Sequence, residues 1–324
     1  MNILDKINEA KTSMLSDGKI EFQTKDIIQA QAFTSQLKQS RAQGFSTGLS
    51  LGWNNFKING REIYTLSENE VDLITGIPNR GKTTFTNNIV FRTASMHHWK
   101  WAIFSPESYP AEEYLQELCA VFMGRESFYC MADSEIETAL TLINKHCYLI
   151  DTNEVSIGNI LSLIKTIHRT VKINAFVLDP YNEFSYTRPK ELSETEYISL
   201  FMSQVKKFCR DENLHGFIVA HPTKPPKDAD AEESRPTPYS ISGSASWYSK
   251  ADNILCVHRS KMDVSSNETQ IHIDKIRRRK YGVTKSKASL FFNYKTQRLE
   301  DVPVVNALDY GRNIKKSNKE QIYE

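Results

Sequence analysis

The stretch VDLITGIPNRGKTTF (71–85) decides the fold of this chain. Its centre, GIPNRGKT (76–83), matches the pattern G-x-x-x-x-G-K-[ST]. An apolar run precedes the motif and a helix-prone run follows it, which is the strand–loop–helix context that the pattern requires. A chance match in a chain of this size has odds of about one in a hundred from average residue frequencies. We therefore interpret the stretch as a phosphate-binding loop.

Each position of this loop has a chemical reason. Glycines let backbone N–H groups close around phosphate oxygens, and the start of the following helix adds the positive end of its dipole. The pattern places Lys82 against the β- and γ-phosphates and the Thr83 hydroxyl against Mg²⁺. The sequence thus predicts a nucleotide site made of Gly76, Pro78, Asn79, Arg80, Gly81, Lys82, Thr83 and Thr84.

Short apolar runs alternate with helical segments after the loop. Besides 71–76, the runs at 101–105, 147–151, 175–179 and 216–221 are typical of buried strands, and residues 193–213 between them are apolar at helical spacing. Strands that alternate with helices predict parallel βαβ units and an α/β fold. Three further strands are expected at 254–258, 270–276 and 288–292.

Asp179 ends one of these predicted strands, where a carboxylate can complete a Mg²⁺ shell. An aspartate after a strand is more often a turn residue or a helix cap. The phosphate-binding loop upstream and the βαβ pattern between them favour the metal role in this chain. We predict that Thr83 and Asp179 hold the metal ion together.

Composition sets wide limits on function. The chain has 324 residues, 40% hydrophobic and 25% charged, a profile typical of a soluble globular protein. The net charge is only +2, so a nucleic-acid partner must meet a local basic patch. Five cysteines without metal-binding spacing are expected to be buried free thiols. The chain shows no membrane span or signal peptide, so we expect a cytoplasmic protein with no membrane partner.

Composition and the pattern of apolar residues divide the chain into three parts. Residues 1–45 are polar and helix-prone, with Ile27, Ile28, Phe33 and Leu37 as their main apolar positions, and are expected to form an arm that docks elsewhere. Residues 46–305 form the expected nucleotide-hydrolysing domain, and 306–324 a flexible tail. Within the domain, residues 222–240 are rich in Pro, Lys, Asp and Glu, which predicts a functional loop.

Two stretches are more specific than the phosphate-binding loop. FSPES (104–108) closes the strand after the loop helix, and VAHPTKPPKDADAEESRPTPYSISGSASWYSKADNILCVHR (219–259) is followed by KIRRRKYG (275–282). Together with TGIPNRGKTTF (75–85) and LDPYNEF (178–184), these stretches strongly resemble the helicase domain of the DnaB/Twinkle family, particularly its phage and organellar members. The likeness runs in order from about residue 48 to 300. It implies a RecA-like P-loop NTPase core with a twisted, mostly parallel sheet.

The resemblance implies roles for two residues at predicted strand ends. Glu107 matches the catalytic carboxylate, which orients and deprotonates the water that attacks the γ-phosphate. His221 matches the polar residue that senses the γ-phosphate and passes its loss to the DNA-binding loop. The simpler interpretations stay open: Glu107 as an acid stabilised by a helix N-terminus, and His221 as a structural residue at a strand end.

Lys275 and Arg277 match the family's K-x-R pair, which reaches the nucleotide of the neighbouring subunit. Residues two apart on a strand share a face, so both cations can point at one phosphate cluster if the strand continues through them. A guanidinium there stabilises charge on the transferring phosphoryl group. Alternatively, residues 275–287 are a solvated basic run, and a shifted register would give the role to Arg278 or Arg279.

The segment 222–243 resembles the central-channel loops that grip single-stranded DNA. Cationic side chains in it can neutralise phosphates, and the Ser-Gly-Ser run could offer backbone N–H groups. Four carboxylates in the same segment, Asp228, Asp230, Glu232 and Glu233, would repel DNA unless they face away. The DNA-binding residues implied are Lys224, Lys227, Arg235, Ser242, Gly243 and Ser244.

As a whole, the resemblance implies a hexameric ring that moves 5′→3′ on single-stranded DNA, unwinds forked duplex DNA, and uses ATP or dTTP with Mg²⁺. Residues 1–45 fit the linker helix that packs on the adjacent subunit. A primase, polymerase or single-strand-binding protein is a further expected partner, and the compartment is the host cytoplasm for a phage protein, with organellar relatives. Two other classes stay open: a RecA-like ATPase that binds DNA without unwinding it, and a P-loop kinase of small molecules.

Overall fold

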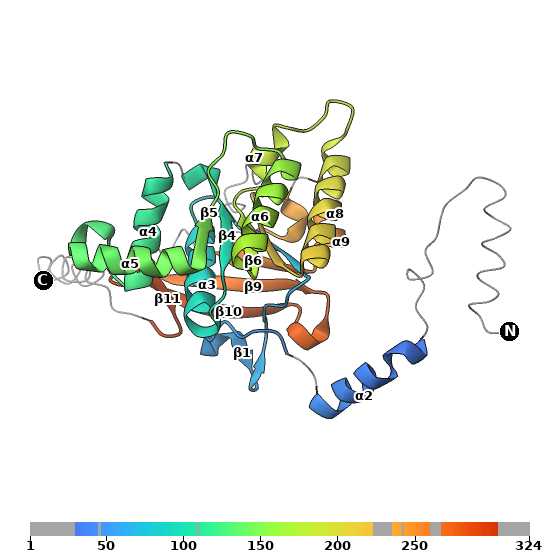
Figure 1. The fold of residues 1–324 in the computed structure, drawn as a ribbon. Helices are drawn as coiled ribbons and strands as arrows, with labels where there is room; N and C mark the ends of the chain where they lie inside the picture. Colours follow the sequence, from blue (N-terminus) through green and yellow to red (C-terminus); the bar gives the residue numbers. More distant parts are fainter. Residues whose placement is uncertain are drawn as a thin grey trace, which may run out of the picture. The chain divides into compact units, whose positions relative to one another are not determined.

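The computed structural model describes residues 30–44, 47–108, 110–222, 235–241, 243–259 and 267–303 (Figure 1). The chain divides into two compact units, Met1–Thr47 and Gly48–Glu324. The described part of the first unit holds the 3₁₀ helix η2 (Ala30–Phe33) and the α-helix α2 (Thr34–Gln43), neither of which has a buried residue. Phe33 and Leu37 are therefore exposed, while Ile27 and Ile28 lie outside the described residues.

The second unit is built on a nine-stranded sheet, counted over the described residues, in the order β11-β10-β9-β8-β3-β7-β6-β4-β5. The strands from β8 to β5 run parallel, and β9, β10 and β11 extend the sheet antiparallel. All eight predicted strands are present: β3 (Val71–Thr75), β4 (Trp101–Phe104), β5 (Cys147–Leu149), β6 (Ala175–Leu178), β7 (His215–Ala220), β8 (Asn253–His258), β9 (Glu268–Ile276) and β10 (Ser286–Asn293).

Helices cover both faces of this sheet (Figure 1). One face packs against α3 (Lys82–His97), α4 (Ala111–Met123) and α5 (Asp133–His146), and the other against α6 (Ile157–Val171), α8 (Glu194–Glu212) and α9 (Ser244–Lys250). Neighbouring strand residues point to opposite faces, so Leu73 and Ile74 of β3 enter different cores. This two-sided burial explains why β3, β4, β6, β7 and β8 are continuous apolar runs, and the layered arrangement confirms the predicted α/β class.

Short elements complete the fold. The polar hairpin of β1 (Lys57–Ile58) and β2 (Arg61–Glu62) and the strand β11 (Arg298–Glu300) lack the apolar runs from which strands are predicted, and the sequence did not reveal them. The remaining elements are α7 (Asn182–Ser185) and the 3₁₀ helices η3 (Asn54–Phe56), η4 (Pro106–Ser108), η5 (Phe128–Cys130), η7 (Pro238–Ser240) and η8 (Arg279–Tyr281). Along the described stretches, none of the helices combines the length and the apolarity needed to cross a membrane.

The cysteines are all free, and four of them are buried. The prediction of five buried thiols is wrong for Cys130, which is exposed. Its flanking residues are apolar, but Cys130 closes the short helix η5, a surface turn between α4 and α5 where Tyr129 is exposed as well. An apolar neighbourhood in sequence therefore did not guarantee burial at this turn.

The sheet order determines where function can reside. The carboxyl ends of four neighbouring parallel strands, in the order β3-β7-β6-β4, lie on the same side of the sheet, and this row of strand ends is called an edge here. The segments after these ends carry the phosphate-binding loop, His221, Asp179 and Glu107, in that order across the sheet. The opposite edge is formed by the amino ends of the parallel strands. There the start of β8 pairs with the end of antiparallel β9, so Asn253 lies opposite Ile276. The predicted K-x-R pair therefore lies at the other edge.

Candidate functional site

The phosphate-binding loop joins β3 to α3, as the sequence predicted. Gly76 has a φ of +154°, and a Cβ there would lie 2.3 Å from the carbonyl oxygen of Val257 on β8. Gly81 precedes α3 with a φ of +88°, in the left-handed region that favours glycine. Among the other predicted loop residues, Pro78 and Asn79 are exposed, and Arg80, Thr83 and Thr84 are half-buried. The loop is thus open to solvent at its tip.

Lys82 is folded over this loop. Its side chain is 5% exposed, and its Nζ donates hydrogen bonds to the carbonyl oxygens of Gly76 (2.9 Å) and Ile77 (3.2 Å). Burial lowers the pKa of Lys82, and the carboxylates of Asp179 and Glu107 act in the opposite direction. The lysine is therefore desolvated and held by neutral carbonyls, from which it can move to a phosphate.

Thr83 and Asp179 meet beside the loop. The Thr83 hydroxyl donates to Asp179 Oδ2 at 3.1 Å, and Asp179 is 5% exposed at the end of β6. Burial raises the pKa of Asp179 to about 6, against the lowering effect of Thr83 and Lys82. A buried carboxylate next to a hydroxyl is an oxygen pair of the kind that Mg²⁺ binds together with substrate phosphates. These two residues therefore fit the predicted metal role.

Glu107 and His221 were predicted from separate motifs and are in contact in the structure. His221 Nε2 lies 3.3 Å from Glu107 Oε1, with Glu107 on η4 after β4 and His221 directly after β7. Burial lowers the pKa of His221, and the charge of Lys82 lowers it further, while Glu107 opposes both. The Glu107 side chain is 52% exposed, so its carboxylate is accessible to a water molecule.

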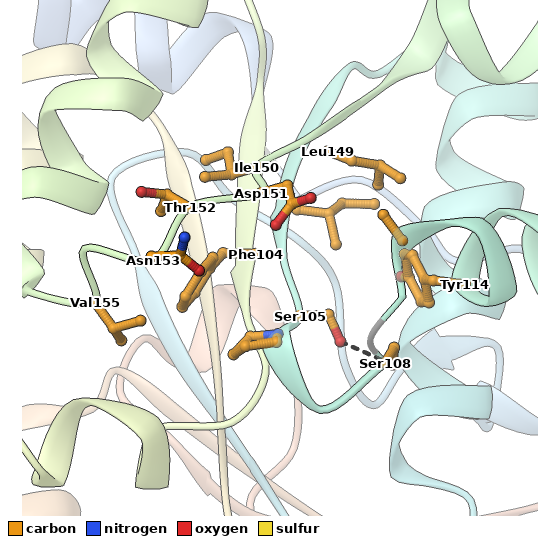
Figure 2. Close-up of a pocket in the computed structure, with 13 residues that line it drawn as sticks. Phe104, Ser105, Ser108, Tyr114, Leu149, Ile150, Asp151, Thr152, Asn153 and Val155 are labelled. Atoms are coloured by element: carbon orange, nitrogen blue, oxygen red, sulfur yellow. Dashed lines mark hydrogen bonds between the residues drawn. The ribbon is translucent and has the colours of Figure 1, made fainter.

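A cavity of about 230 Å³ opens beside the turn that carries Glu107 (Figure 2). Ser105 and Ser108 of that turn line it, with their hydroxyl oxygens 3.1 Å apart, and it is closed by Tyr114 of α4 and by residues 149–153, which are the last residue of β5 and the four that follow. The phosphate-binding loop does not line this cavity. The cavity therefore lies beside the predicted nucleotide site. Four residues of FSPES (104–108) line it, but no cavity was predicted from that motif.

Lys275 and Arg277 share one face at the opposite edge of the sheet. β9 ends at Ile276, but the Arg277 N–H still donates to the Asp252 carbonyl at 2.9 Å, so the extended pairing continues. Lys275 Nζ donates to the carbonyl oxygen of Ala251 at 2.7 Å, and burial and Arg277 lower its pKa to about 8. Arg277 Nη2 donates to the Ser249 carbonyl at 3.1 Å.

The contacts of Arg278 and Arg279 do not favour the shifted register, in which one of them would take the role predicted for Arg277. Arg278 Nε lies 3.6 Å from the buried Glu70 carboxylate, and the carbonyl of Arg279 accepts a hydrogen bond from Arg61. Sequence reasoning missed Asp252, whose Oδ1 lies 3.2 Å from Arg277 Nε. The only signal for it was an aspartate just before an apolar strand, which by itself marks a turn.

The predicted DNA-binding residues are only partly described. Lys224, Lys227 and Ser242 lie outside the described residues. Arg235 Nη1 donates to both carboxylate oxygens of Asp274, at 2.8 and 2.7 Å, so a DNA contact would compete with this ion pair. Gly243, with a φ of +66°, precedes α9, and Ser244 is the first residue of that helix.

Known proteins resemble this chain in sequence and in fold. Residues 54–301 match the family model of the DnaB-like helicase C terminal domain. The Twinkle homolog protein, chloroplastic/mitochondrial, of Arabidopsis thaliana is 28% identical over 289 residues, which are 85% of this chain and 40% of that protein. The chain thus spans less than half the length of this relative.

Two solved structures share the fold. A DnaB-like replicative helicase, described with its interactions with primase, aligns with a TM-score of 0.67 and 17% identity, covering 85% of this chain and 67% of that chain. A second structure, an ATPase domain, aligns with a TM-score of 0.66 and 17% identity, covering 84% of this chain and 97% of that chain. Both confirm the RecA-like core. Because the family model matches residues 54–301, which are most of the chain, the chain belongs to the DnaB-like helicase C-terminal domain family.

Proposed function

We propose that this chain is a ring-forming, NTP-dependent replicative DNA helicase that moves 5′→3′ on single-stranded DNA and unwinds forked duplex DNA. One observation carries the proposal. Lys82, Thr83, Asp179, Glu107 and His221 gather at one edge of the sheet, and the K-x-R pair lies at the other. A complete hydrolytic site then needs one edge from each of two chains.

The residues at the first edge suit hydrolysis of a nucleoside triphosphate. Glu107 takes a proton from water as the water oxygen bonds to the γ-phosphorus and the bond to the β–γ bridging oxygen breaks. The Lys82 ammonium offsets negative charge on the β- and γ-phosphates. Thr83 and Asp179 would hold Mg²⁺, which when bound neutralises phosphate charge.

His221 suits the role of a sensor because it contacts Glu107 and directly precedes the 222–240 segment. Loss of the γ-phosphate changes the charge facing Glu107 and Lys82, and both carry electrostatic interactions with His221. A shift of the imidazole then moves the first residue of the segment that resembles the DNA-binding loops. This is the route by which hydrolysis would act on DNA.

The two edges are too far apart for one chain to complete its own site. β3 has five residues and separates them by about 16 Å, at about 3.3 Å per residue. We infer that chains assemble head to tail, with the K-x-R pair of one facing the nucleotide of the next, and that six subunits close the ring. The exposed apolar side chains of η2 and α2 would dock on the adjacent subunit.

The remaining proposals follow from this assignment. The arm is 1–45, the ATPase domain 46–305 and the tail 306–324; the nucleotide is ATP or dTTP. Single-stranded and forked DNA are the substrates, with Lys224, Lys227, Arg235, Ser242, Gly243 and Ser244 as the candidate contacts. A primase is the first further partner to examine, because one solved structure of the same fold is described with primase. A polymerase and a single-strand-binding protein are the others.

The decisive test is strand separation on forks with a single tail. We expect Mg²⁺- and nucleotide-dependent unwinding when the 5′ tail is present, none when only the 3′ tail is present, and none for Lys82→Ala. DNA-stimulated hydrolysis without any unwinding would instead identify a RecA-like clamp. Hydrolysis that is indifferent to DNA would favour a small-molecule kinase.

A further inference from the structure

A second, strongly charged cavity of about 450 Å³ lies at the edge of the sheet that carries the K-x-R pair. α8, α9 and the segment after β9 line it, and its charged residues are Lys206, Lys207, Arg210, Asp211, Lys250 and Arg277. We propose that this cavity receives the triphosphate of a nucleotide bound by a second copy of the chain, with Arg210 and Lys250 as phosphate contacts beside Arg277. This inference rests on the proposed head-to-tail assembly.

The charges around the cavity are out of balance. Lys207 forms an ion pair with Asp211, while Lys206 and Arg277 share the single carboxylate of Asp252. Five cations thus face two carboxylates. Burial lowers the pKa of Lys206, the hydrogen bond and charge of Asp252 act in the opposite direction, and the nearby charges of Arg277 and Arg210 lower it further. Mutual repulsion among partly desolvated cations is relieved by a polyanion, which is the chemistry of a triphosphate.

Three of the cations, Lys206, Lys250 and Arg277, are held in place before any ligand arrives. Asp252 is 4% exposed, and it accepts hydrogen bonds from the Val71 N–H (3.0 Å) and from Lys206 Nζ (2.8 Å), besides its ion pair with Arg277. Lys250 Nζ donates to the Ser203 hydroxyl at 2.8 Å. The partner of Lys250 is the neutral Ser203 hydroxyl, and Arg277 shares the Asp252 carboxylate with Lys206. Both cations can therefore engage a phosphate without leaving a buried carboxylate unpaired.

Topology excludes the chain's own nucleotide as the occupant. The Val71 N–H that binds Asp252 belongs to the first residue of β3, whereas the phosphate-binding loop follows the last one. The two positions are about 16 Å apart along the strand. A triphosphate that reaches Arg277 must therefore be held by another chain.

The experiment uses the double variant Arg210→Gln/Lys250→Gln of the full chain. Alone, it should hydrolyse nucleotide at least about tenfold more slowly than the unmodified chain, because every boundary lacks two phosphate contacts. Arg169→Gln/Lys172→Gln is the matched control: it removes the same two charges from exposed positions at the end of α6 and should keep full activity.

Mixing experiments identify whose nucleotide the cavity serves. Co-assembled with Glu107→Gln, the double variant should regain part of the missing hydrolysis, which also shows that it folds; co-assembled with Arg277→Ala, it should regain none. Full activity of the double variant alone overturns the proposal, as does recovery with Arg277→Ala but not with Glu107→Gln. Loss of single-stranded DNA binding with unchanged DNA-free hydrolysis makes DNA the occupant. If Glu107→Gln and Arg277→Ala themselves do not complement, the head-to-tail assembly has failed instead.

Discussion

At the scale of single residues, the nucleotide site combines buried charge with weak internal partners. Lys82 is almost fully buried, yet among the described residues its ammonium donates hydrogen bonds only to the carbonyls of Gly76 and Ile77. Asp179 has only the Thr83 hydroxyl as a hydrogen-bond partner of its carboxylate in the described part of the chain. Each group has given up solvation without gaining a strong internal partner, so ligand binding can repay that cost.

Replacing Lys82 with alanine should reduce hydrolysis at least about a hundredfold while the fold is retained. The change removes a phosphate contact and no part of the apolar core. Steady-state turnover and thermal unfolding, measured on the same preparation, check both halves of this expectation. Lys145→Ala, an exposed lysine of α5, is the control and should change neither. Turnover near that of the unmodified chain would mean that the phosphate-binding loop has been misassigned.

The three cationic candidates for DNA binding should not behave alike. Lys224→Ala and Lys227→Ala should each weaken single-stranded DNA binding for all sequences, and flatten its salt dependence by roughly 0.7 for each phosphate that is no longer neutralised. Arg235→Ala should also lower the free energy of unfolding, because it leaves the half-buried Asp274 carboxylate without its ion pair. Salt titrations of binding and denaturant unfolding give the two readouts. An unchanged salt slope in the triple variant would place the DNA elsewhere.

At the scale of elements, the amino-terminal ends of β3 and β8 bury a group of acids. Glu70 lies just before β3, and Asp72 lies within it; Asn253 Nδ2 donates to both carboxylates, at 3.0 and 2.8 Å. Burial raises the pKa of both acids, and the charge of Asp72 raises that of Glu70 further. Arg278 faces Glu70, and His215 lies 3.6 Å from Asp72. The carboxyl protons of Glu70 and Asp72 are therefore bound more tightly in the folded chain than in the unfolded chain.

This arrangement makes stability depend on pH in a defined direction. Because the folded pKa values exceed the unfolded ones, the stabilisation is complete in acid, below the ordinary carboxyl range, and is lost as pH rises toward about 7. Glu70→Gln should flatten the fall in unfolding free energy between pH 5 and 7 by roughly 2 kcal/mol. Denaturant titrations across that range measure it, with the exposed Glu126→Gln as the control. A parallel pH profile for Glu70→Gln would exclude these carboxylates as the cause.

How much of the structure could be predicted from the sequence differs between elements. The central strands β3, β4, β6, β7 and β8 were predictable because they are buried along nearly their whole length and so are apolar runs. Along β9 and most of β10, buried residues alternate with more exposed ones, which is the other pattern typical of a strand. The glycines of the predicted phosphate-binding loop stand where the backbone needs them, because Gly76 closely approaches Val257 and Gly81 has a positive φ. The ion pair of Arg235 with Asp274 joins residues 39 apart, and Asp252 meets Arg277 across a backbone hydrogen bond between β-strand ends. Such pairings depend on strand register, which local pattern does not specify.

At the scale of the whole molecule, the head-to-tail assembly can be tested by complementation. Glu107→Gln and Arg277→Ala should each be nearly inactive alone, because every boundary then lacks one partner. In an equal random mixture, about a quarter of the boundaries pair an intact Glu107 with an intact Arg277, and hydrolysis should recover to about that level. Subunits must be refolded together or exchange freely. Co-assembled rings without any recovery would refute the sharing of sites between chains.

The five residues of β3 that separate the two edges have a consequence for the kinetics of the protein. In the proposed head-to-tail assembly, each chain carries half of a hydrolytic site at each end of β3, so a chain that is alone has no complete site. Turnover per chain is then a collective quantity, which rises with protein concentration and falls on dilution even though every molecule stays folded. Dilution thus works as an off-switch without any inhibitor. A chain displaced from its neighbours loses the capacity to consume nucleotide at the moment it can no longer use the energy.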